Sequence, residues 1–255
     1  MRGAPYEPEG LSLGDWPLRG IGTELKKSMP KYPRYQDYVI RDGRLIGEFE
    51  QLYRDFEDPW LEAKSEQFAS DKAAGLNLLC RLKAHHGIRS VLELGCGFGH
   101  FSARVAANDL KAVGIDISET AISIARTRHL NAEFHVGTIE DHDLIREIKP
   151  EVIVMAEVTW YVLGQLKPFI EFLQSELPGC YLLHLLTTYP PGVQTYGTNY
   201  FTDLAGIKSY FGMRYLESGE VHDTEGGART WFLGTWDRRL ESVWQAAYEL
   251  PASKP

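Results

Sequence analysis

Short apolar runs alternate with amphipathic segments along the chain from residue 91 onwards. The runs are rich in branched aliphatic side chains, as buried strands are, and they span 91–94, 112–116, 133–137, 152–156 and 181–187. Between them apolar positions recur at helical spacing, which predicts helices near 98–108, 118–129, 141–148 and 163–177, the second with Ser118 as its N-cap. This alternation predicts a parallel sheet built from βαβ units.

Segments on both sides extend this pattern. Ahead of the first strand, one helix is predicted from Ile46 to the Asp58-Pro59 pair and another over about 65–85. After the fifth strand we expect a helix near 202–211 and then two late strands, at 214–221 and 229–236, joined by a turn at 225–227. One face of a terminal amphipathic helix is marked by Leu240, Val243, Trp244, Ala247 and Tyr248.

The predicted fold class is α/β: a Rossmann-like seven-stranded sheet, mostly parallel and closed by a β-hairpin, with helices on both faces and an N-terminal helical arm. With 255 residues the chain suits one domain with appendages. Residues 1–45 are rich in proline, glycine and tyrosine without a sustained period, so we expect an irregular arm that acts as a lid. Residues 46–236 would form the domain with its leading helices, and residues 237–255 a C-terminal helix and tail.

The composition of the chain disfavours several classes of protein and partner. The chain is 44% hydrophobic and 24% charged, so it can bury a full core. Its 27 Lys and Arg against 35 Asp and Glu give a net charge of -8, which repels phosphate backbones, and we expect no nucleic acid as partner. There is no apolar run of about 18 residues and no signal-peptide core near the first residues, so no membrane contact and a cytoplasmic location are expected.

The thiols and histidines do not predict a metal. Cys80, Cys96 and Cys180 are odd in number and widely spaced, which indicates reduced structural thiols. His85 and His86 are adjacent and no HExxH motif is present, so we read them as surface residues and expect no metal site.

The main chemical signal is the run from Val91 to His100, VLELGCGFGH, in which an apolar strand leads through glycines at 95, 97 and 99 into a helix. A dinucleotide-binding loop would have a glycine where His100 stands, and its pyrophosphate would be repelled by Glu93. A cationic ligand fits better. S-adenosylmethionine (SAM) carries an ammonium and a sulfonium, and its carboxylate can meet backbone N–H groups at the helix start. A tight turn in any α/β protein is the alternative.

Two acids lie where ligands bind in open α/β sheets, beyond the carboxyl ends of strands. Asp116 ends the second strand, 23 residues after Glu93, and is placed to accept hydrogen bonds from both ribose hydroxyls. Glu157 ends the fourth strand. The alternatives are a helix N-terminal acid for Asp116 and a salt-bridged loop acid for Glu157.

Over residues 57–187 the sequence resembles class I SAM-dependent methyltransferases, and within them the group that includes nodulation protein S. The segments that carry the resemblance are Glu57-Asp-Pro-Trp60, the Glu93–Gly99 loop, Gly114-Ile-Asp116-Ile-Ser118 and Val154-Met-Ala-Glu157-Val-Thr-Trp-Tyr161. The resemblance implies SAM as cofactor, S-adenosylhomocysteine (SAH) as product and methylation of a small molecule, which in the nodulation group is an amino sugar methylated on nitrogen. The regions before residue 45 and after residue 187 depart from that group or are longer.

The resemblance also implies where adenine would bind, after the third strand. Class I enzymes commonly have an acid at the position of Thr138, so the contact would shift to Ile139, Glu140 or Asp141, unless these are plain surface acids. The expected cofactor site comprises Glu93, Gly95, Cys96, Gly97, Asp116, Ile117, Ile139, Glu140 and Glu157.

Methyl transfer is an in-line displacement that mainly needs alignment and exclusion of water, so a strong base is not required. The expected catalytic residues are Glu157, Tyr161 and His222. His222 and Asp223 follow the sixth strand, which the family topology makes parallel, so they could face the site, and an ordinary exposed turn is the favoured alternative. His184, flanked by leucines inside the fifth strand, is better read as a core histidine.

Aromatic residues are numerous in the segments expected around the pocket: Trp60, Trp160, Tyr161, Tyr189, Tyr196, Tyr200 and Phe201. They can stack on sugars or hold a cation, and core packing is the alternative. We therefore expect a small polar acceptor, such as an amino or hydroxylated sugar, methylated on N or O.

Two alternative functions stay open. One is a SAM-binding module or inactive partner subunit, and the other is a polyamine synthase, which would typically have a second catalytic acid beside Glu157. A homodimer through the C-terminal helix is a further expectation.

Overall fold

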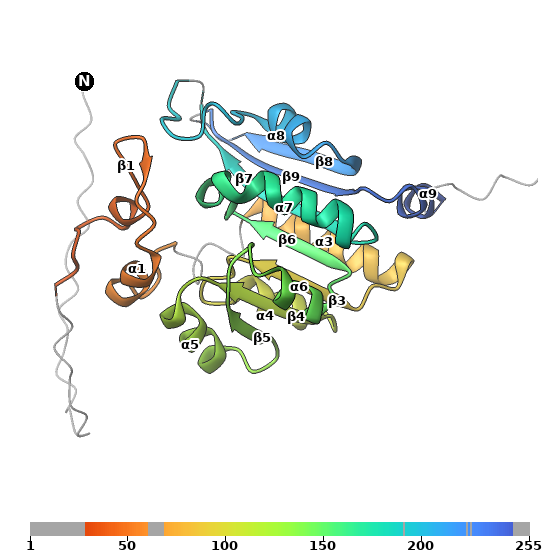
Figure 1. Cartoon of the computed structure of the whole chain (residues 1–255), viewed down its shortest axis with the longest axis horizontal. Coiled ribbons are helices and arrows are strands. Elements are labelled where there is room, and N and C mark those ends of the chain that lie inside the picture. The colour runs from red at the N-terminus through yellow and green to blue at the C-terminus, as the bar shows by residue number, and fades with distance from the viewer. Residues whose placement is uncertain (1–28, 61–68, 191, 223, 225, 247–255) are drawn as a thin grey trace, which may run out of the picture.

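A mixed β-sheet forms the centre of the chain, seen here in a computed structural model that describes residues 29–60, 69–190, 192–222, 224 and 226–246. The strands of this sheet are β3 (Ser90–Leu94), β4 (Lys111–Asp116), β5 (Glu133–Val136), β6 (Val152–Ala156), β7 (Tyr181–Thr188), β8 (Arg214–His222) and β9 (Ala228–Thr235). Within the described residues it has seven strands in the order β5-β4-β3-β6-β7-β9-β8. The β3 to β7 pairs are parallel, whereas β9 is antiparallel to both β7 and β8 (Figure 1). The predicted sheet, its closing hairpin and the parallel sense of β8 are confirmed.

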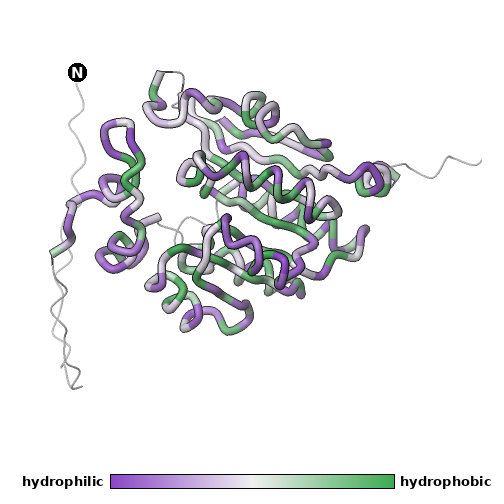
Figure 2. The backbone as a smooth tube through the Cα atoms, viewed as in Figure 1, coloured by the Kyte–Doolittle hydropathy of each residue, from purple (hydrophilic) through white to green (hydrophobic). Residues whose placement is uncertain are grey.

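Helices cover both faces of this sheet, as predicted. They are α3 (Ser70–His86), α4 (His100–Ala106), α5 (Glu119–Arg128), α6 (His142–Ile148), α7 (Leu163–Glu176), α8 (Leu204–Phe211) and α9 (Arg238–Ala246). The apolar side chains of α6, α7 and α8 share one cluster with one face, and those of α3, α4 and α9 share another with the opposite face. Apolar residues accordingly concentrate in the strands and the inner sides of the helices (Figure 2).

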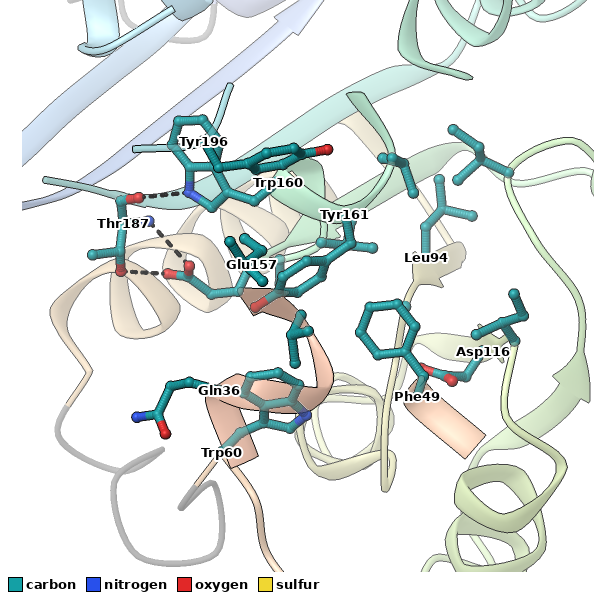
Figure 3. Close-up of a pocket in the computed structure, with 18 of the residues that line it drawn as sticks. Gln36, Phe49, Trp60, Leu94, Asp116, Glu157, Trp160, Tyr161, Thr187 and Tyr196 are labelled. Carbon is teal, nitrogen blue, oxygen red and sulfur yellow. Dashed lines mark hydrogen bonds between the residues drawn. The ribbon is translucent and has the colours of Figure 1, made fainter. Parts of the chain in front are cut away.

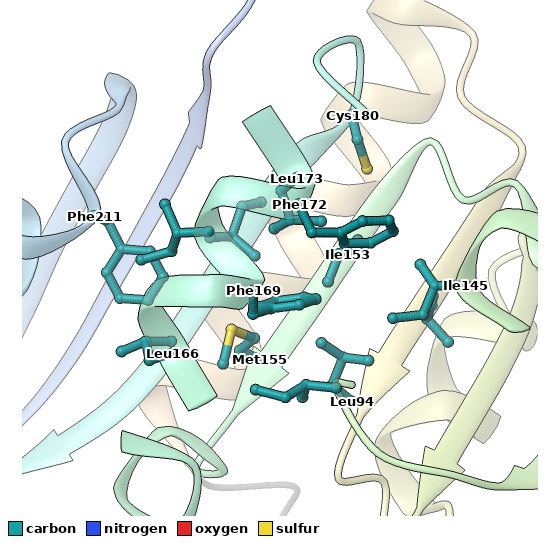
Figure 4. Packing of buried hydrophobic residues seen from close by; sticks show 14 of the residues in the cluster. Leu94, Ile145, Ile153, Met155, Leu166, Phe169, Phe172, Leu173, Cys180 and Phe211 are labelled. Carbon is teal, nitrogen blue, oxygen red and sulfur yellow. The ribbon is translucent and has the colours of Figure 1, made fainter. Parts of the chain in front are cut away.

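The strand β6 shows why the centre is stable. All of its residues are buried, because successive side chains point to opposite faces and both faces are covered. Ile153 and Met155 pack against Phe169 of α7 (Figure 4), while Val152 and Val154 belong to the cluster of α3. Each such side chain stabilises the fold by about 1.5–3 kcal/mol relative to exposure.

The arm ahead of the domain is more regular than the sequence indicates. In the structure the arm comprises residues 29–60 and contains the 3-10 turn η1 (Tyr35–Tyr38) and a hairpin of β1 (Ile40–Arg41) and β2 (Arg44–Leu45). It also includes the helix α1 (Phe49–Asp55), which was predicted as a leading helix of the domain. The expectation of an irregular segment up to residue 45 is therefore wrong for the described part. The arm lies beside the carboxyl ends of the parallel strands, at the left of the view (Figure 1).

One carboxylate fastens the arm to the domain. Glu50 of α1 accepts hydrogen bonds from the Ser118 hydroxyl (2.6 Å) and from the hydroxyl and the backbone N–H of Thr120 (2.6 and 3.2 Å). These groups begin α5, where exposed N–H groups and the helix dipole favour a negative charge. Ser118 also caps α5 as predicted, because its oxygen accepts from Ala121 N–H. Burial alone would raise the pKa of Glu50, but these hydrogen bonds outweigh it and lower the pKa to about 2.

The terminal helix α9 lies at the far side of the sheet from the arm (Figure 1). Its Trp244 is buried against α3, with Arg81 over the indole ring at 5.0 Å and His86 at 5.4 Å between ring centroids. The apolar face of this helix thus packs on its own domain, while Val243 remains exposed. Tyr248 and Ala247 lie outside the described residues, and a homodimer through this helix stays a prediction.

Two expectations from composition can be compared with the structure. All three cysteines are thiols, as predicted. None of the helices in the described part of the chain combines the length and the apolar character needed to cross a membrane.

The docking of the arm predicts a specific pH dependence. Because the folded pKa of Glu50 lies below its ordinary 4.5, the carboxylate stabilises the fold above that pH and the contribution is lost as the pH falls towards about 2. Glu50→Gln should lower the free energy of unfolding near neutral pH by about 1 kcal/mol, as loss of a helix cap does. Denaturant titrations of both proteins should converge on acidification.

The control is Glu48→Gln, which removes a neighbouring carboxylate of the arm whose partner is Lys31 at the surface. It should change stability little at any pH, because exposed ion pairs contribute little. A difference between wild type and Glu50→Gln that stays constant down to acid pH would contradict this role of Glu50.

Candidate functional site

A cavity of about 630 Å³ opens where the arm meets the carboxyl ends of β3, β4, β6 and β7. Its volume lies within the ~300–1,000 Å³ common for small-molecule sites. Strand ends supply one wall, and the arm supplies another through Tyr35, Gln36, Phe49, Tyr53 and Trp60 (Figure 3). The described part of the arm therefore forms part of the cavity wall, and its action as a lid stays a prediction.

The glycine loop closes tightly at Gly95. This residue lines the cavity and has φ +69, a left-handed conformation that favours glycine. A Cβ added here would lie 2.5 Å from Cγ2 of Val158, which is closer than packed atoms allow. The loop can therefore take this path beside the start of the segment after β6 only with glycine at this position.

Asp116 is fixed at the end of β4. One carboxylate oxygen accepts from Gly97 N–H and the other from Ser118 N–H, each at 2.9 Å. Each oxygen of a carboxylate has room for a second hydrogen bond, and Asp116 lines the cavity. The side chain is thus oriented by the backbone and can still accept two hydroxyl donors from a ligand.

The predicted adenine segment also meets the cavity. Ile117, Ile139 and Glu140 line it, as does Thr138. Asp141 has another role among the described residues: its carboxylate accepts from Thr138 N–H at 2.6 Å and from the Thr138 hydroxyl at 3.0 Å. Of the two acids weighed for this segment, Glu140 alone faces the cavity.

Three of the predicted cofactor residues do not line this cavity. Glu93 is buried beneath the loop and accepts from the Ser102 hydroxyl of α4 at 2.5 Å. Cys96 packs in a small core with Ile122 and Phe134, and Gly97 contributes its N–H to Asp116. In the structure these three residues support the loop from inside the protein, and their contact with the cofactor stays a prediction.

Glu157 lies at the carboxyl end of β6 in an uncommon backbone conformation, with φ +59. Its carboxylate lines the cavity and accepts from Thr187 twice, from N–H at 3.1 Å and from the hydroxyl at 2.8 Å (Figure 3). Burial and the nearby charge of Asp71 raise the pKa of Glu157, although the Thr187 hydrogen bonds oppose this. Raised carboxyl pKa values and strained backbone cluster at functional sites.

Tyr161, at the end of the turn η2 (Thr159–Tyr161), lies beside Glu157 in the cavity. Its ring centroid is 5.8 Å from that of Trp60 and 5.2 Å from that of Phe49, so residues of the arm enclose it (Figure 3). Burial, followed by the proximity of Tyr189 and Glu157, raises the pKa of Tyr161 far above its ordinary value. The phenol therefore stays protonated and can donate a hydrogen bond.

The other aromatic residues divide into two groups. Trp60, Trp160, Tyr189 and Tyr196 line the cavity, as expected. Phe201 and Tyr200 instead join the cluster under α7 and α8, as in the core-packing alternative. Trp160 also donates its indole N–H to the carbonyl of Thr187 at 2.9 Å. This bond helps to position Thr187, which in turn donates to Glu157.

The two histidines considered for the site lie elsewhere. His184 is fully buried, with Nε2 2.8 Å from the Thr159 hydroxyl, and burial lowers its pKa to about 3, so it is a neutral core residue as expected. His222 ends the edge strand β8 with its side chain 62% exposed, 3.1 Å from Glu220, and it is absent from the described lining of the cavity. Asp223 lies outside the described residues.

Several residues that line the cavity were not predicted from the sequence. Lys72 of α3 and Arg229 of β9 reach the cavity, as do Gln165 and Gln194. Lys72 lies within a helix predicted for packing, and Arg229 begins a strand predicted for the closing hairpin. For metals, no group of three or more His, Cys, Asp or Glu side chains that could hold an ion occurs among the described residues.

Comparison with known proteins agrees with this geometry. The family described as methyltransferase domain matches residues 91–171, from β3 to within α7. The ubiquinone biosynthesis O-methyltransferase of Hydrogenovibrio crunogenus is 30% identical over 78 residues, 29% of this chain and 32% of that protein. The malonyl-[acyl-carrier protein] O-methyltransferase of Pectobacterium atrosepticum is 32% identical over 77 residues, 30% of each chain.

Residues 91–171 therefore match a methyltransferase domain. The chain spans about a third of the length of these two curated relatives, so the match concerns the domain. The likeness in fold extends beyond residues 91–171. The N-methyltransferase NodS of Bradyrhizobium japonicum WM9, solved with SAH, has a TM-score of 0.51 and 19% identity and covers 70% of this chain and 93% of NodS. At that identity the likeness concerns the fold alone.

The close approach at Gly95 predicts that the methyltransferase domain does not tolerate a side chain there. Gly95→Ala should strain the left-handed backbone and also push Val158 aside, so SAH binding measured by calorimetry should fall at least tenfold. Gly87→Ala is the matched control, because Gly87 has φ +68 but no atom within 4 Å of an added Cβ. Equal behaviour of the two variants would contradict the packing argument.

Proposed function

We propose that the chain is an enzyme that binds SAM in this cavity and transfers its methyl group to N or O of a small polar metabolite. The observation that carries the proposal is that Gly95 and Asp116, the residues suited to the cofactor, share one cavity with Glu157 and Tyr161, the residues suited to the acceptor. SAM supplies an electrophilic methyl on a good leaving group, so the protein needs to align the two ligands and exclude water.

Each lining residue has a role that its surroundings favour. Asp116 accepts hydrogen bonds from the ribose hydroxyls, because Gly97 and Ser118 hold its carboxylate in place. Ile117 and Ile139 offer apolar contacts to adenine, with Glu140 beside its polar edge. The loop at Gly95 allows the methionine end to approach the backbone.

Glu157 and Tyr161 would act on the acceptor. A carboxylate whose pKa is raised binds a proton more readily, so Glu157 can orient an amine or hydroxyl and take the proton that methylation releases. Tyr161 stays neutral and can donate to an oxygen of the acceptor. These two side chains orient the nucleophile, and the arm over Tyr161 keeps water away.

The acceptor class follows from the cavity. The arm limits its size, the aromatic walls offer stacking faces, and the net charge of -8 disfavours nucleic acid. The relatives named above act on different molecules, so none of them identifies the acceptor. We also propose that the arm moves when the cofactor binds, that the protein is located in the cytoplasm and that it has no nucleic-acid partner.

Cofactor binding through Asp116 is directly testable. Asp116→Asn should weaken SAH binding at least tenfold in calorimetry, because hydrogen bonds to a charged group are worth about 1.5–3 kcal/mol and the amide presents a donor on one side. Asp143→Asn, which removes an exposed acid of α6, should bind SAH as the wild type does. An unchanged dissociation constant for Asp116→Asn would refute the ribose assignment.

Kinetic measurements can separate a role of Glu157 and Tyr161 in catalysis from a role in cofactor binding. For acceptors found by SAH release from a panel of amines and hydroxylated metabolites, Glu157→Gln and Tyr161→Phe should each lower kcat/KM by roughly 10²-fold while SAH affinity changes little. Loss of Glu157 should also remove the fall in rate at acid pH, since its raised pKa means protonation begins nearer neutrality.

Tyr210→Phe serves as control, because Tyr210 packs against Tyr200 and Phe201 instead of lining the cavity. Equal losses of SAH affinity and turnover in the Glu157 and Tyr161 variants would reassign both residues to the cofactor. SAH binding without turnover on any acceptor would favour a binding module over an enzyme.

A further inference from the structure

Two cations line the cavity and have no part in the roles assigned so far. Lys72 comes from the first turn of α3 and is buried, and Arg229 comes from the start of β9. The charge of Lys72 opposes the rise in the pKa of Glu157, which lines the same cavity. Cations are costly to bury beside a cavity unless a charge on the protein or on its ligand offsets them.

The register of the sheet places Arg229 next to the reacting end. Arg229 pairs directly with Thr187 across the antiparallel strands β7 and β9. Side chains of directly paired residues point to the same face of a sheet, and the Thr187 hydroxyl is the one that donates to Glu157. Glu157, Thr187 and Arg229 thus lie in a row along three neighbouring strands (Figure 3 shows the first two).

Arg229 uses little of its capacity to donate hydrogen bonds in the contact with its partner in the protein. Its Nη1 lies 3.3 Å from the buried Asp71 carboxylate, and the arginine side chain remains 47% exposed. A guanidinium has five N–H donors in a fork that matches carboxylate and phosphate groups bidentately. One long contact leaves donors for a ligand in the cavity that Arg229 lines.

The position also distinguishes acceptor from cofactor. In the sheet, β9 lies three strands away from β3, which is roughly 14 Å at ~4.8 Å per strand. The loop after β3 is where the methionine end of SAM would bind. An anion held by Arg229 would therefore belong to the molecule on the other side of Glu157.

We propose that the methyl acceptor carries an oxyanion, a carboxylate or a phosphate, that Arg229 binds with help from Lys72 while Glu157 and Tyr161 orient the group to be methylated. This inference rests on the proposed function and narrows it to anionic acceptors. It also fixes the direction in which the acceptor lies in the cavity. The nucleophile of the acceptor lies next to Glu157, and its anionic group lies next to β9.

The test uses the full chain loaded with SAH and three matched pairs of probes: N-acetylglucosamine 6-phosphate and N-acetylglucosamine, glucuronate and glucose, and 4-hydroxybenzoate and 4-hydroxybenzamide. Binding is measured by ligand-observed NMR titration. For at least one pair, the anionic member should bind tenfold or more tightly than the neutral member. Arg229→Gln should remove most of that preference, and Arg229→Lys should restore only part of it, because an ammonium lacks the fork.

Two controls keep the outcome clear. Arg214→Gln removes a half-buried arginine of β8 that pairs with Glu241 outside the cavity, and it should keep the preference. If Arg229→Gln is unstable because Asp71 loses its partner, the double variant Asp71→Asn with Arg229→Gln removes both charges and should show the same loss of preference.

Each remaining outcome counts against the inference. No anionic probe binding at millimolar concentration, or a preference that survives Arg229→Gln, would overturn it. A tenfold loss of SAH affinity in Arg229→Gln would assign this arginine to the carboxylate of the cofactor instead. Failure of the wild type to bind SAH at all would instead refute the proposed function, so the two failures are distinguishable.

Discussion

The carboxylate of Asp116 is held by two backbone N–H groups, and much of the site depends on that arrangement. Gly97 N–H comes from the glycine loop after β3, and Ser118 N–H comes from the start of α5. The same Ser118 donates its hydroxyl to Glu50, which brings the arm to this turn. One short stretch after β4 thereby joins the loop, the helix and the arm, and the cavity exists because these three elements meet there.

The sequence predicted the fold well because its information is periodic. The five parallel strands β3 to β7 coincide with apolar runs, and the order of the sheet follows from βαβ units and a final hairpin. The hairpin in the arm was missed although Asp42 and Gly43 form a strong two-residue turn signal, and both have positive φ. Its strands are two residues each, too short for the alternation of polar and apolar positions to show.

The site was predictable in position more than in detail. Strand ends placed Asp116 and Glu157 correctly beside one cavity, because the carboxyl ends of parallel strands share an edge. A sequence does not reveal which way a loop residue points, so it did not predict that Glu93 and Cys96 pack beneath the loop and are absent from the lining of the cavity. Lys72 and Arg229 were missed because their contribution depends on tertiary packing between segments far apart in the chain.

The backbone at Glu157 carries a further consequence. A left-handed conformation costs a residue with a side chain roughly 1 kcal/mol, which glycine would avoid. Glycine would however remove the carboxylate that Thr187 holds in the cavity. Selection for stability and selection for chemistry therefore act in opposite directions at this position, and a library screened for heat resistance alone would drift towards a more robust protein without its acid.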